Sequence, residues 1–264
     1  SASSSSHGYT LGGANDAAGN PGYASHACEK YPFASDSGGV DVGDLILAVG
    51  RSCGHSDGNY GYVCGGMTET TTINYDMIQS KSFASEANAD TTQNLSANRN
   101  RMVACQTLTY GYLLGGAPST TATATNIIER YQFATTNNCV DVGDLVMGAR
   151  RESGGSSSTT HGYTHGGTTA VAATKINIIE KVQMVATANS TDVADTMVTK
   201  TGMTGTSSTT HGYVSGGNIS TGTSYTNIID KQKIVNWFII EVKKYGILII
   251  EFLENGVCAF LRNY

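Results

Sequence analysis

Short runs of alternating polar and apolar residues, each closed by a pair of glycines, recur along most of the chain. In one such run His161, Tyr163 and His165 fall on one side, while Gly162 and Thr164 fall on the other. Successive residues of a β-strand point to opposite faces, so this alternation predicts a strand. A glycine pair suits the end of a strand, where the backbone turns without needing room for a side chain. The pattern predicts short strands joined by tight turns.

This pattern repeats with a period near 50 residues. Each copy contains a histidine or tyrosine, then a glycine and a tyrosine, and the glycine pair follows two residues later. The first glycine of each copy is Gly8, Gly61, Gly111, Gly162 or Gly212. The glycine pairs are Gly12 and Gly13, Gly65 and Gly66, Gly115 and Gly116, Gly166 and Gly167, and Gly216 and Gly217. Five copies at nearly constant spacing indicate a repeat architecture.

Two further blocks keep the same period. The first reads Asn-Ile-Ile followed by an acidic and a basic residue, and it covers residues 126–133, 177–181 and 227–231. The second reads Val-Asp-Val-Gly-Asp-Leu and covers residues 40–45 and 140–145, with weaker copies at Asp90 and Asp192. An arginine follows the second block three times, as Arg51, Arg101 and Arg151. Each unit has room for about four short strands.

A four-stranded sheet repeated at this interval is typical of a β-propeller. The order of the blocks resembles that of kelch repeats. An apolar strand ends in Gly-Gly, Ile-Ile-Glu-Arg-Tyr follows, and a late strand and an arginine come last. The tryptophan that is usual near the fourth strand of a kelch repeat is missing. The blocks also resemble degenerate propeller repeats of structural and tail-associated proteins of marine bacteriophages. We predict an all-β, kelch-like β-propeller with five blades of four-stranded antiparallel sheets and a divergent last blade.

The last part of the chain departs from the repeat. No serine or threonine follows Thr226, and the only tryptophan, Trp237, lies there. We assign residues 1–233 to the propeller and residues 234–264 to a divergent or foreign β-rich segment, with strands expected at 234–242, 246–253 and 257–261. The chain starts in mid-repeat, so an N-terminal strand is expected to complete the last blade and close the ring.

Composition and charge exclude several classes of function. The net charge is −5, with 16 basic and 21 acidic residues, so no basic surface for nucleic acid is expected. No run approaches the roughly 20 apolar residues of a membrane span, so no membrane insertion is expected. The six cysteines match no zinc-binding spacing. We expect buried thiols, with a disulfide between Cys53 and Cys64 as the alternative.

Two sets of repeated residues are candidates for binding. The position before the first glycine holds His7, Tyr60, Tyr110, His161 and His211. These residues either lie near the propeller axis and bind a metal or a sugar, or bond to the backbone of the next blade, which is the interpretation that we favour. Turns in the second block hold Asp41, Asp44, Asp141, Asp144, Asp192 and Asp195. These carboxylates either ligate calcium or cap their own turns and pair with the repeated arginines, and we favour the second interpretation.

No nucleophile motif, phosphate-binding loop, zinc-protease helix or dinucleotide fingerprint is present, so we expect no enzyme and no cofactor or metal. The expected function is that of a structural or binding propeller on a virus particle, as in a receptor-binding tail fibre, or elsewhere outside the cell. Its partners would be other structural proteins or a cell-surface glycan or protein. The alternatives are a cytoplasmic kelch-type protein-interaction module and, less favoured, a metal or copper enzyme.

Recognition is expected in the variable segments that follow the glycine pairs, because loops on a rigid scaffold usually carry binding. These segments are Ala14–Ser25, Met67–Tyr75, Ala117–Thr125, Thr168–Lys175 and Asn218–Thr226.

Overall fold

The computed structural model describes residues 2–15, 23–68, 73–118, 123–170, 174–184, 186–219 and 224–234, together with three strands between residues 239 and 261. Every regular element in these ranges is a β-strand. The described residues therefore include no helix that is long and apolar enough to cross a membrane.

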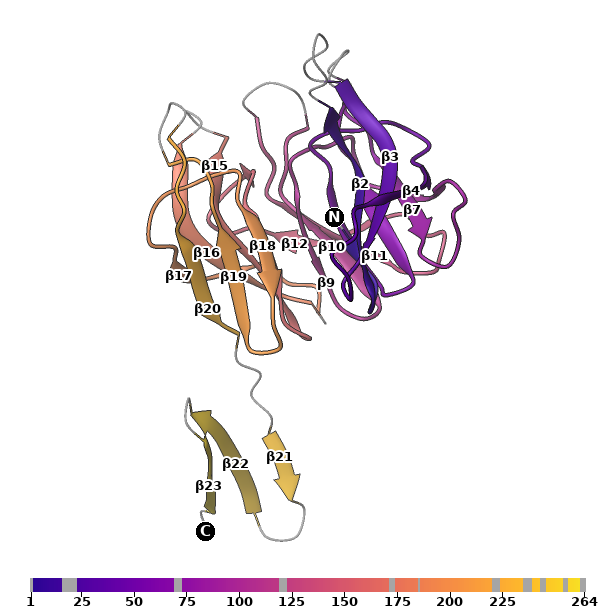
Figure 1. Ribbon diagram of the computed structural model, residues 1–264. Helices are drawn as coiled ribbons and strands as arrows, with labels where there is room; N and C mark the ends of the chain where they lie inside the picture. The colour runs from indigo at the N-terminus through magenta and orange to yellow at the C-terminus, as the bar shows by residue number, and fades with distance from the viewer. Residues whose placement is uncertain are drawn as a thin grey trace.

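Five small antiparallel sheets form the blades of a propeller (Figure 1). Blade 1 consists of β1 (Ala2–Ser3), β2 (His7–Asn15), β3 (Tyr23–Pro32) and β4 (Val40–Asp44). Blade 2 consists of β5 (Cys53–Ser56), β6 (Tyr60–Cys64), β7 (Met77–Ser82) and β8 (Asp90–Asn94). Blade 3 consists of β9 (Val103–Gln106), β10 (Tyr110–Leu114), β11 (Ile127–Gln132) and β12 (Val140–Asp144).

The last two blades continue this plan with small differences. Blade 4 consists of β14 (Gly154–Ser157), β15 (His161–Thr169), β16 (Lys175–Gln183) and β17 (Thr191–Asp195), and the short β13 (Arg150–Arg151) also pairs with β15. Blade 5 has three strands in the described residues, β18 (Thr204–Ser207), β19 (His211–Ser215) and β20 (Ile229–Lys233). The predicted all-β fold with five propeller blades is confirmed.

The first strand of each blade lies nearest the axis. These inner strands contact one another in the order β1, β5, β9, β14 and β18, and no contact of comparable extent joins the described strands of blade 5 to blade 1. The prediction that an N-terminal strand completes the last blade is wrong, because β1 pairs with β2 inside blade 1, with Ala2 opposite Tyr9. The residues just before each His/Tyr-Gly-Tyr segment form the inner strand of their own blade.

The hydrophobic core lies between neighbouring blades. The tyrosine after the first glycine packs on an apolar residue that follows the third strand of the next blade. Tyr9 stacks on Phe83 with ring centroids 4.1 Å apart, and Tyr62 stacks on Phe133 at 4.9 Å. The same pairing joins Tyr112 to Met184 and Tyr163 to Ile234. Burial of these large side chains holds consecutive blades together.

The second glycine of the first four pairs connects its blade to the next one through the backbone. The amide of Gly66 donates to the carbonyl of Arg99 at 2.9 Å. Its φ is 103°, and a Cβ there would lie 2.8 Å from the Gly50 carbonyl oxygen, so only glycine fits. Equivalent bonds are Gly13 to Val49 at 3.2 Å, Gly116 to Arg150 at 2.8 Å and Gly167 to Lys200 at 2.9 Å.

A buried ion pair recurs in three blades. Arg99, just before the inner strand β9, donates to the carboxylate of Glu129 on β11, and both side chains are fully buried. A break in the pairing register between Ile128 and Glu129 redirects the carboxylate toward this arginine. Arg150 and Glu180 form the same pair in blade 4, and Lys200 and Asp230 form it in blade 5.

Blade 2 replaces the ion pair with a neutral arrangement. Val49 and Gln79 stand at the two positions, and the Gln79 amide accepts from the Leu47 amide at 2.9 Å and donates to the Leu47 carbonyl at 3.1 Å. The fold therefore accepts either solution, provided that the buried polar group keeps its hydrogen bonds.

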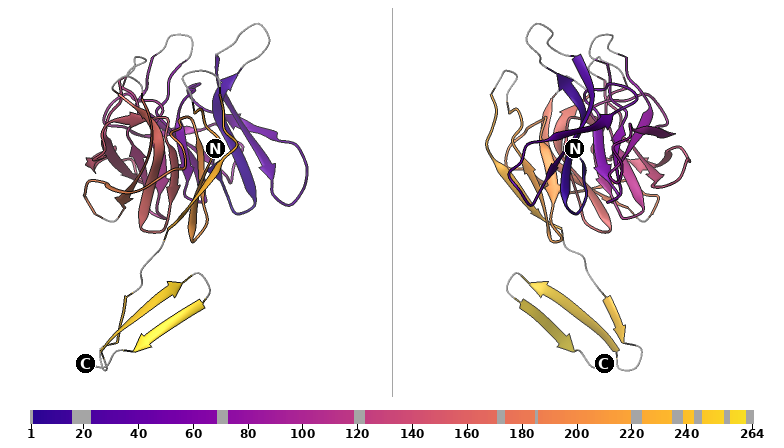
Figure 2. Two further views of the ribbon diagram at one scale, coloured as in Figure 1. Left: turned by 90° about the vertical axis from the view of Figure 1, so that its left-hand side faces the viewer. Right: turned by 45° about the vertical axis from the view of Figure 1, so that its right-hand side comes forward.

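The C-terminal segment forms a sheet of its own. The strands β21 (Ile239–Val242), β22 (Gly246–Leu253) and β23 (Gly256–Leu261) pair in that order, and Figure 2 shows this sheet outside the blades. Ile234, which the sequence places after the propeller boundary, is buried against Tyr163 and Ile179. The propeller therefore extends at least to Ile234.

We predict that the neutral pair of blade 2 substitutes for the ion pair of blade 3. Removing one partner of a buried ion pair costs about 3–5 kcal/mol, because the other charge is left unpaired. The single variant Arg99→Val is expected to lose free energy of unfolding on this scale. The double variant Arg99→Val with Glu129→Gln is expected to recover most of it. Urea denaturation of the three proteins measures the difference, and a double variant no better than the single one contradicts the prediction.

A second prediction concerns the end of the propeller. Truncation after Asn236 is expected to leave the melting temperature unchanged, because the Tyr163–Ile234 contact is kept. Ile234→Ala is expected to lower the free energy of unfolding by about 2–5 kcal/mol, the usual cost of emptying a buried isoleucine site. Thermal melting of both variants tests this, and a large loss on truncation alone would show that the C-terminal sheet stabilises the blades.

Candidate functional site

The five predicted binding residues begin the second strand of their blades, one strand away from the axis, so they do not surround it. Each of the three histidines is held locally, by the hydroxyl of the residue before it. The ring Nδ1 lies 2.8 Å from Ser6 Oγ in His7, 2.9 Å from Thr160 Oγ1 in His161 and 2.9 Å from Thr210 Oγ1 in His211. Tyr110 instead carries the guanidinium of Arg130 4.9 Å above its ring.

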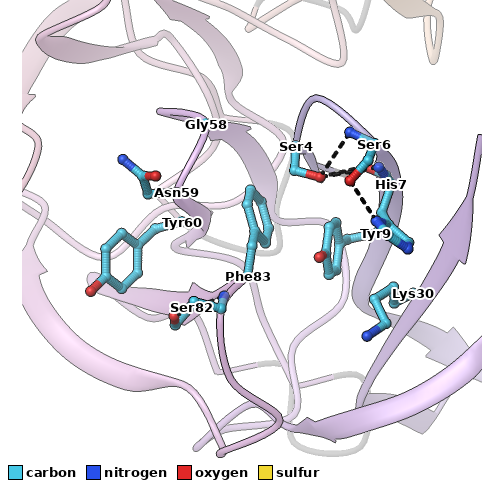
Figure 3. A pocket seen from close by; sticks show the side chains of 11 residues that line it. Ser4, Ser6, His7, Tyr9, Lys30, Gly58, Asn59, Tyr60, Ser82 and Phe83 are labelled. Atoms are coloured by element: carbon cyan, nitrogen blue, oxygen red, sulfur yellow. Dashed lines mark hydrogen bonds between the residues drawn. The ribbon is translucent and has the colours of Figure 1, made fainter.

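Two of these residues, His7 and Tyr60, line a pocket of about 570 Å³ between blades 1 and 2. It lies at the end of the ring opposite the glycine pairs. Figure 3 shows Tyr9 and Phe83 facing each other in the middle, with Tyr60 on one side and His7 on the other. The lining residues are Ser4, Ser6, His7, Tyr9, Lys30, Gly58, Asn59, Tyr60, Ser82, Phe83 and Ala84. We refer to this site as the aromatic pocket.

Local turns place the polar groups of the aromatic pocket. The Ser4 hydroxyl accepts from the amide of His7 at 3.0 Å, which fixes the turn between β1 and β2. In the matching turn of blade 2, Asp57 accepts from the amides of Asn59 at 2.8 Å and Tyr60 at 2.7 Å. The Tyr60 ring, 39% exposed, is therefore presented on a rigid turn.

The floor and one wall of the aromatic pocket differ in polarity. Tyr9 is only 3% exposed, and burial raises its pKa above the ordinary value near 10. Its phenol is therefore neutral. Lys30 supplies a positive charge on the wall, 3.8 Å from a carboxylate oxygen of Glu86. The pocket combines aromatic faces with hydroxyl, amide and ammonium groups.

Buried contacts differ between the first two junctions. At the junction of blades 2 and 3, His55 on the inner strand and Tyr131 on the third strand are buried and bond to each other. At the junction of blades 1 and 2, Ala2 and Lys81 stand at those positions, and the Lys81 ammonium turns to the carbonyls of Ser85 at 2.7 Å and Ala87 at 2.8 Å. Neither Ala2 nor Lys81 lines the aromatic pocket.

Two histidines that the sequence does not single out as sites are buried. Burial lowers the pKa of His55 to about 3, and it lowers the pKa of His165 to about 4. His165 lies 2.9 Å from the hydroxyl of Ser156. Both rings are therefore neutral packing groups, and the described residues contain no group of three histidine, cysteine, aspartate or glutamate side chains that could hold a metal ion.

The repeated aspartates divide into two kinds. Asp41 and Asp141 each accept the amide of the glycine two residues later, at 2.9 and 3.0 Å, and so cap their own turns as the favoured interpretation predicts. Asp44 and Asp144 interact with the next blade through their backbone amides, which donate to Asn88 and Asn189 at 3.0 and 2.9 Å.

The expected pairing of these aspartates with Arg51, Arg101 and Arg151 stays a prediction. Two other arginines, the fully buried Arg99 and Arg150, pair with Glu129 and Glu180 of the Asn-Ile-Ile block. Asp192 and Asp195 lie in an exposed strand. The strand register also changes the assignment of Asp90. Asp90 lies opposite Ser80 in blade 2, and Val140 lies opposite Arg130 at the same place in blade 3. Asp90 therefore matches Val140 and not Asp141.

A second hollow, of about 460 Å³, lies at the end of the axis where the inner strands begin. One residue from each of four blades adopts a left-handed backbone there: Arg51, Arg101, Glu152 and Gly202. Backbone hydrogen bonds link the four residues in a row. The amide of Arg101 donates to the carbonyl of Arg51 at 2.8 Å, that of Glu152 to Arg101 at 3.0 Å, and that of Gly202 to Glu152 at 2.8 Å. Arg51, Arg101 and Arg151 are thus not one structural position, because Glu152 takes the third place.

The variable segments after the glycine pairs are described in part. In blades 1 and 4 the strands continue past the glycines, with Gly13 opposite Ser25 and Gly167 opposite Ile176. Residues 16–22, 69–72, 119–122, 171–173 and 220–223 lie outside the described residues.

The cysteines with described side chains carry free thiols. Cys28, Cys53, Cys64, Cys105 and Cys139 form no disulfide, although Cys53 lies opposite Cys64 in neighbouring strands. Burial raises the pKa of Cys28 to about 11 and of Cys105 to about 12, so these thiols stay protonated and unreactive. Cys258 lies in the part whose side chains are not described.

Comparison with known proteins supports the fold class. No family model and no curated protein matches the sequence. The architecture is that of a β-propeller. Among solved structures, the structure of YjhT resembles it with a TM-score of 0.73 at 9% identity, covering 97% of this chain and 81% of that chain. At this identity the likeness concerns the fold alone.

The buried histidines predict a loss of stability in acid. A histidine with a native pKa near 3 stays neutral in the folded state, whereas the unfolded chain binds a proton below its ordinary pKa near 6.5. Stability is therefore full above pH 6.5 and falls as the pH is lowered, by up to about 1.4 kcal/mol per pH unit for each histidine.

His55→Gln is expected to flatten this pH dependence by about half, because the contribution of His165 remains. The exposed His26 gives a matched control, and His26→Gln is expected to keep the full slope. Urea denaturation at pH 7 and pH 5 measures the slopes. Equal slopes for the native chain and His55→Gln would disprove the assignment.

Proposed function

We propose that this protein is a non-enzymatic binding propeller and that the aromatic pocket between blades 1 and 2 recognises a glycan. The observation that carries the proposal is the exposed Tyr60 ring beside the stacked pair of Tyr9 and Phe83, set among hydroxyl and amide groups. Sugar rings present an apolar face of C–H groups and a rim of hydroxyls. An aromatic face with polar groups around it matches both.

Each part of the pocket has a role in this proposal. Tyr60 stacks on one sugar ring, because its side chain is exposed and its backbone is fixed by Asp57. Ser4, Ser6 and Asn59 donate to and accept from sugar hydroxyls. Lys30 favours a glycan that carries a carboxylate or sulfate, because its side chain lines the pocket and is 27% exposed.

The variable segments at the opposite end of the ring form a second recognition surface in this proposal, suited to a protein partner. We place the protein outside the cell or on a virus particle, where a receptor-binding propeller would meet a cell-surface glycan. Its resemblance to phage structural repeats supports this location, and detection of the protein in purified particles tests it.

A glycan array tests the binding function, and two tyrosine variants test the site. Tyr60→Ala is expected to weaken binding of the best ligand about tenfold or more, because loss of one aromatic contact removes about 1.4 kcal/mol. Tyr110→Ala is the matched control, since Tyr110 holds the same repeat position in blade 3 and does not line the pocket. It is expected to bind normally.

Two results would overturn the proposal. One is the absence of any glycan ligand on the array for folded protein. The other is an equal loss of binding in both tyrosine variants, which would place recognition away from the aromatic pocket.

A further inference from the structure

Four junctions between consecutive blades share one set of contacts. Each joins a tyrosine of one blade to an apolar residue of the next, and each joins the second glycine of a pair to a carbonyl of the next blade. In three of them a polar side chain also bonds across the inner strands. These bonds are Ser3 with Ser56 at 3.0 Å, Gln106 with Ser56 at 2.6 Å and Ser157 with Ser207 at 2.7 Å.

The face of blade 5 that points away from blade 4 has the tyrosine and the glycine amide of this set of contacts, but the residues of a next blade that would bind them are not there in the described residues. In the part of the chain that the structure describes, Tyr213 has no apolar partner from a following blade, and the amide of Gly217 has no carbonyl acceptor. Thr206 of the inner strand is exposed, whereas the matching Ser156 is buried against Gly212 of blade 5.

The free face of blade 1 carries the other side of this set of contacts. Phe33 is 56% exposed, whereas Phe133 at the same repeat position is 6% exposed against Tyr62. Tyr31 is 41% exposed, whereas the matching Tyr131 is buried and bonded to His55 of the preceding blade. These exposed aromatic rings lie where the other blades make contact with a neighbour.

An unpaired charge accompanies this face. Glu29 occupies the position of Glu129, Glu180 and Asp230, each of which is buried with a cation. In blade 3 the cation, Arg99, lies seven positions before Gln106 of the inner strand. Ser3 matches Gln106 in blade 1, so a cation for Glu29 would lie seven positions before Ser3. Among the described residues Glu29 is exposed and meets only the hydroxyl of Thr10, at 3.3 Å.

We propose that the opening between blades 5 and 1 receives a sixth blade of the same repeat. Such a sheet presents an apolar residue to Tyr213, a tyrosine to Phe33 and a basic residue to Glu29 from the segment that leads into β1. It continues an interface that the chain has already built four times. In Figure 1 blade 5 lies on the left and blade 1 on the right, with β9 and β10 of blade 3 between them in the view.

Two other arrangements are alternatives to a sixth blade. Direct closure of blade 5 on blade 1 would bury Phe33 against Tyr213, and the described residues make no such contact. A second copy would offer the same two faces, and the oligomeric state tests that alternative. The match covers 81% of the YjhT chain, so about a fifth of that chain is unmatched. This fraction is about the length that one further blade would need.

Adding a blade tests the proposal. A copy of residues 101–154 is placed directly before Ser1, which puts the copied Arg150 seven positions before Ser3 and the copied Tyr112 opposite Phe33. Phe33→Ala and the matched Phe133→Ala are made in the natural and the extended chain. If Phe133→Ala does not fold, Phe133→Leu and Phe33→Leu replace the pair.

In the natural chain Phe33→Ala is expected to leave the melting temperature unchanged, while Phe133→Ala lowers it by about 5 °C or more. In the extended chain both variants are expected to lower it similarly, and the extended chain is expected to melt higher than the natural one. If the extended chain does not fold, a copy of residues 134–195 replaces the chain after Ile234, which brings the copied Tyr163 opposite Phe33.

Three results would overturn the proposal. Loss of stability on Phe33→Ala in a natural chain that light scattering shows to be monomeric means that the ring closes on itself. The same loss in an oligomeric natural chain means that a second copy covers the face. No effect of Phe33→Ala in a folded extended chain means that the added blade does not occupy the opening.

Discussion

The contact between consecutive blades is the interaction on which the rest of this structure depends. One blade is too small a sheet to bury its apolar residues alone, so it is stable only when its tyrosine packs on the next blade, as Tyr62 does on Phe133. The glycine amides add backbone bonds at the same four junctions. Each of the first four blades therefore depends on the next.

Because the junction is repeated, small differences between copies have local consequences. Ala2 and Lys81 stand where blades 2 and 3 have the bonded pair of His55 and Tyr131. Tyr60 lines the aromatic pocket, whereas Tyr110 at the same repeat position carries the guanidinium of Arg130 over its ring. The proposed site thus combines repeated positions with residues that differ between blades.

The repeat and its strands could be predicted from the sequence because their determinants are local. Alternation, the glycine pairs and the fixed spacing each describe a single blade. The partners across junctions could not be predicted in this way. Arg99 pairs with Glu129 thirty residues later, while Arg101, two positions on, reaches Glu152 of the next repeat at 3.0 Å. His7 and Tyr60 were predicted as binding residues, yet the pocket that they line is shared by two blades, and no local pattern predicts which side chains meet there.

Amide hydrogen exchange at the glycine pairs tests the central claim, that one repeated junction holds consecutive blades and ends at blade 5. Exchange of an amide that bonds across a packed junction requires that junction to open. The account predicts slow exchange for Gly66, Gly116 and Gly167, which donate to the next blade, and fast exchange for Gly217. Equal protection of all four amides in the natural chain would contradict it.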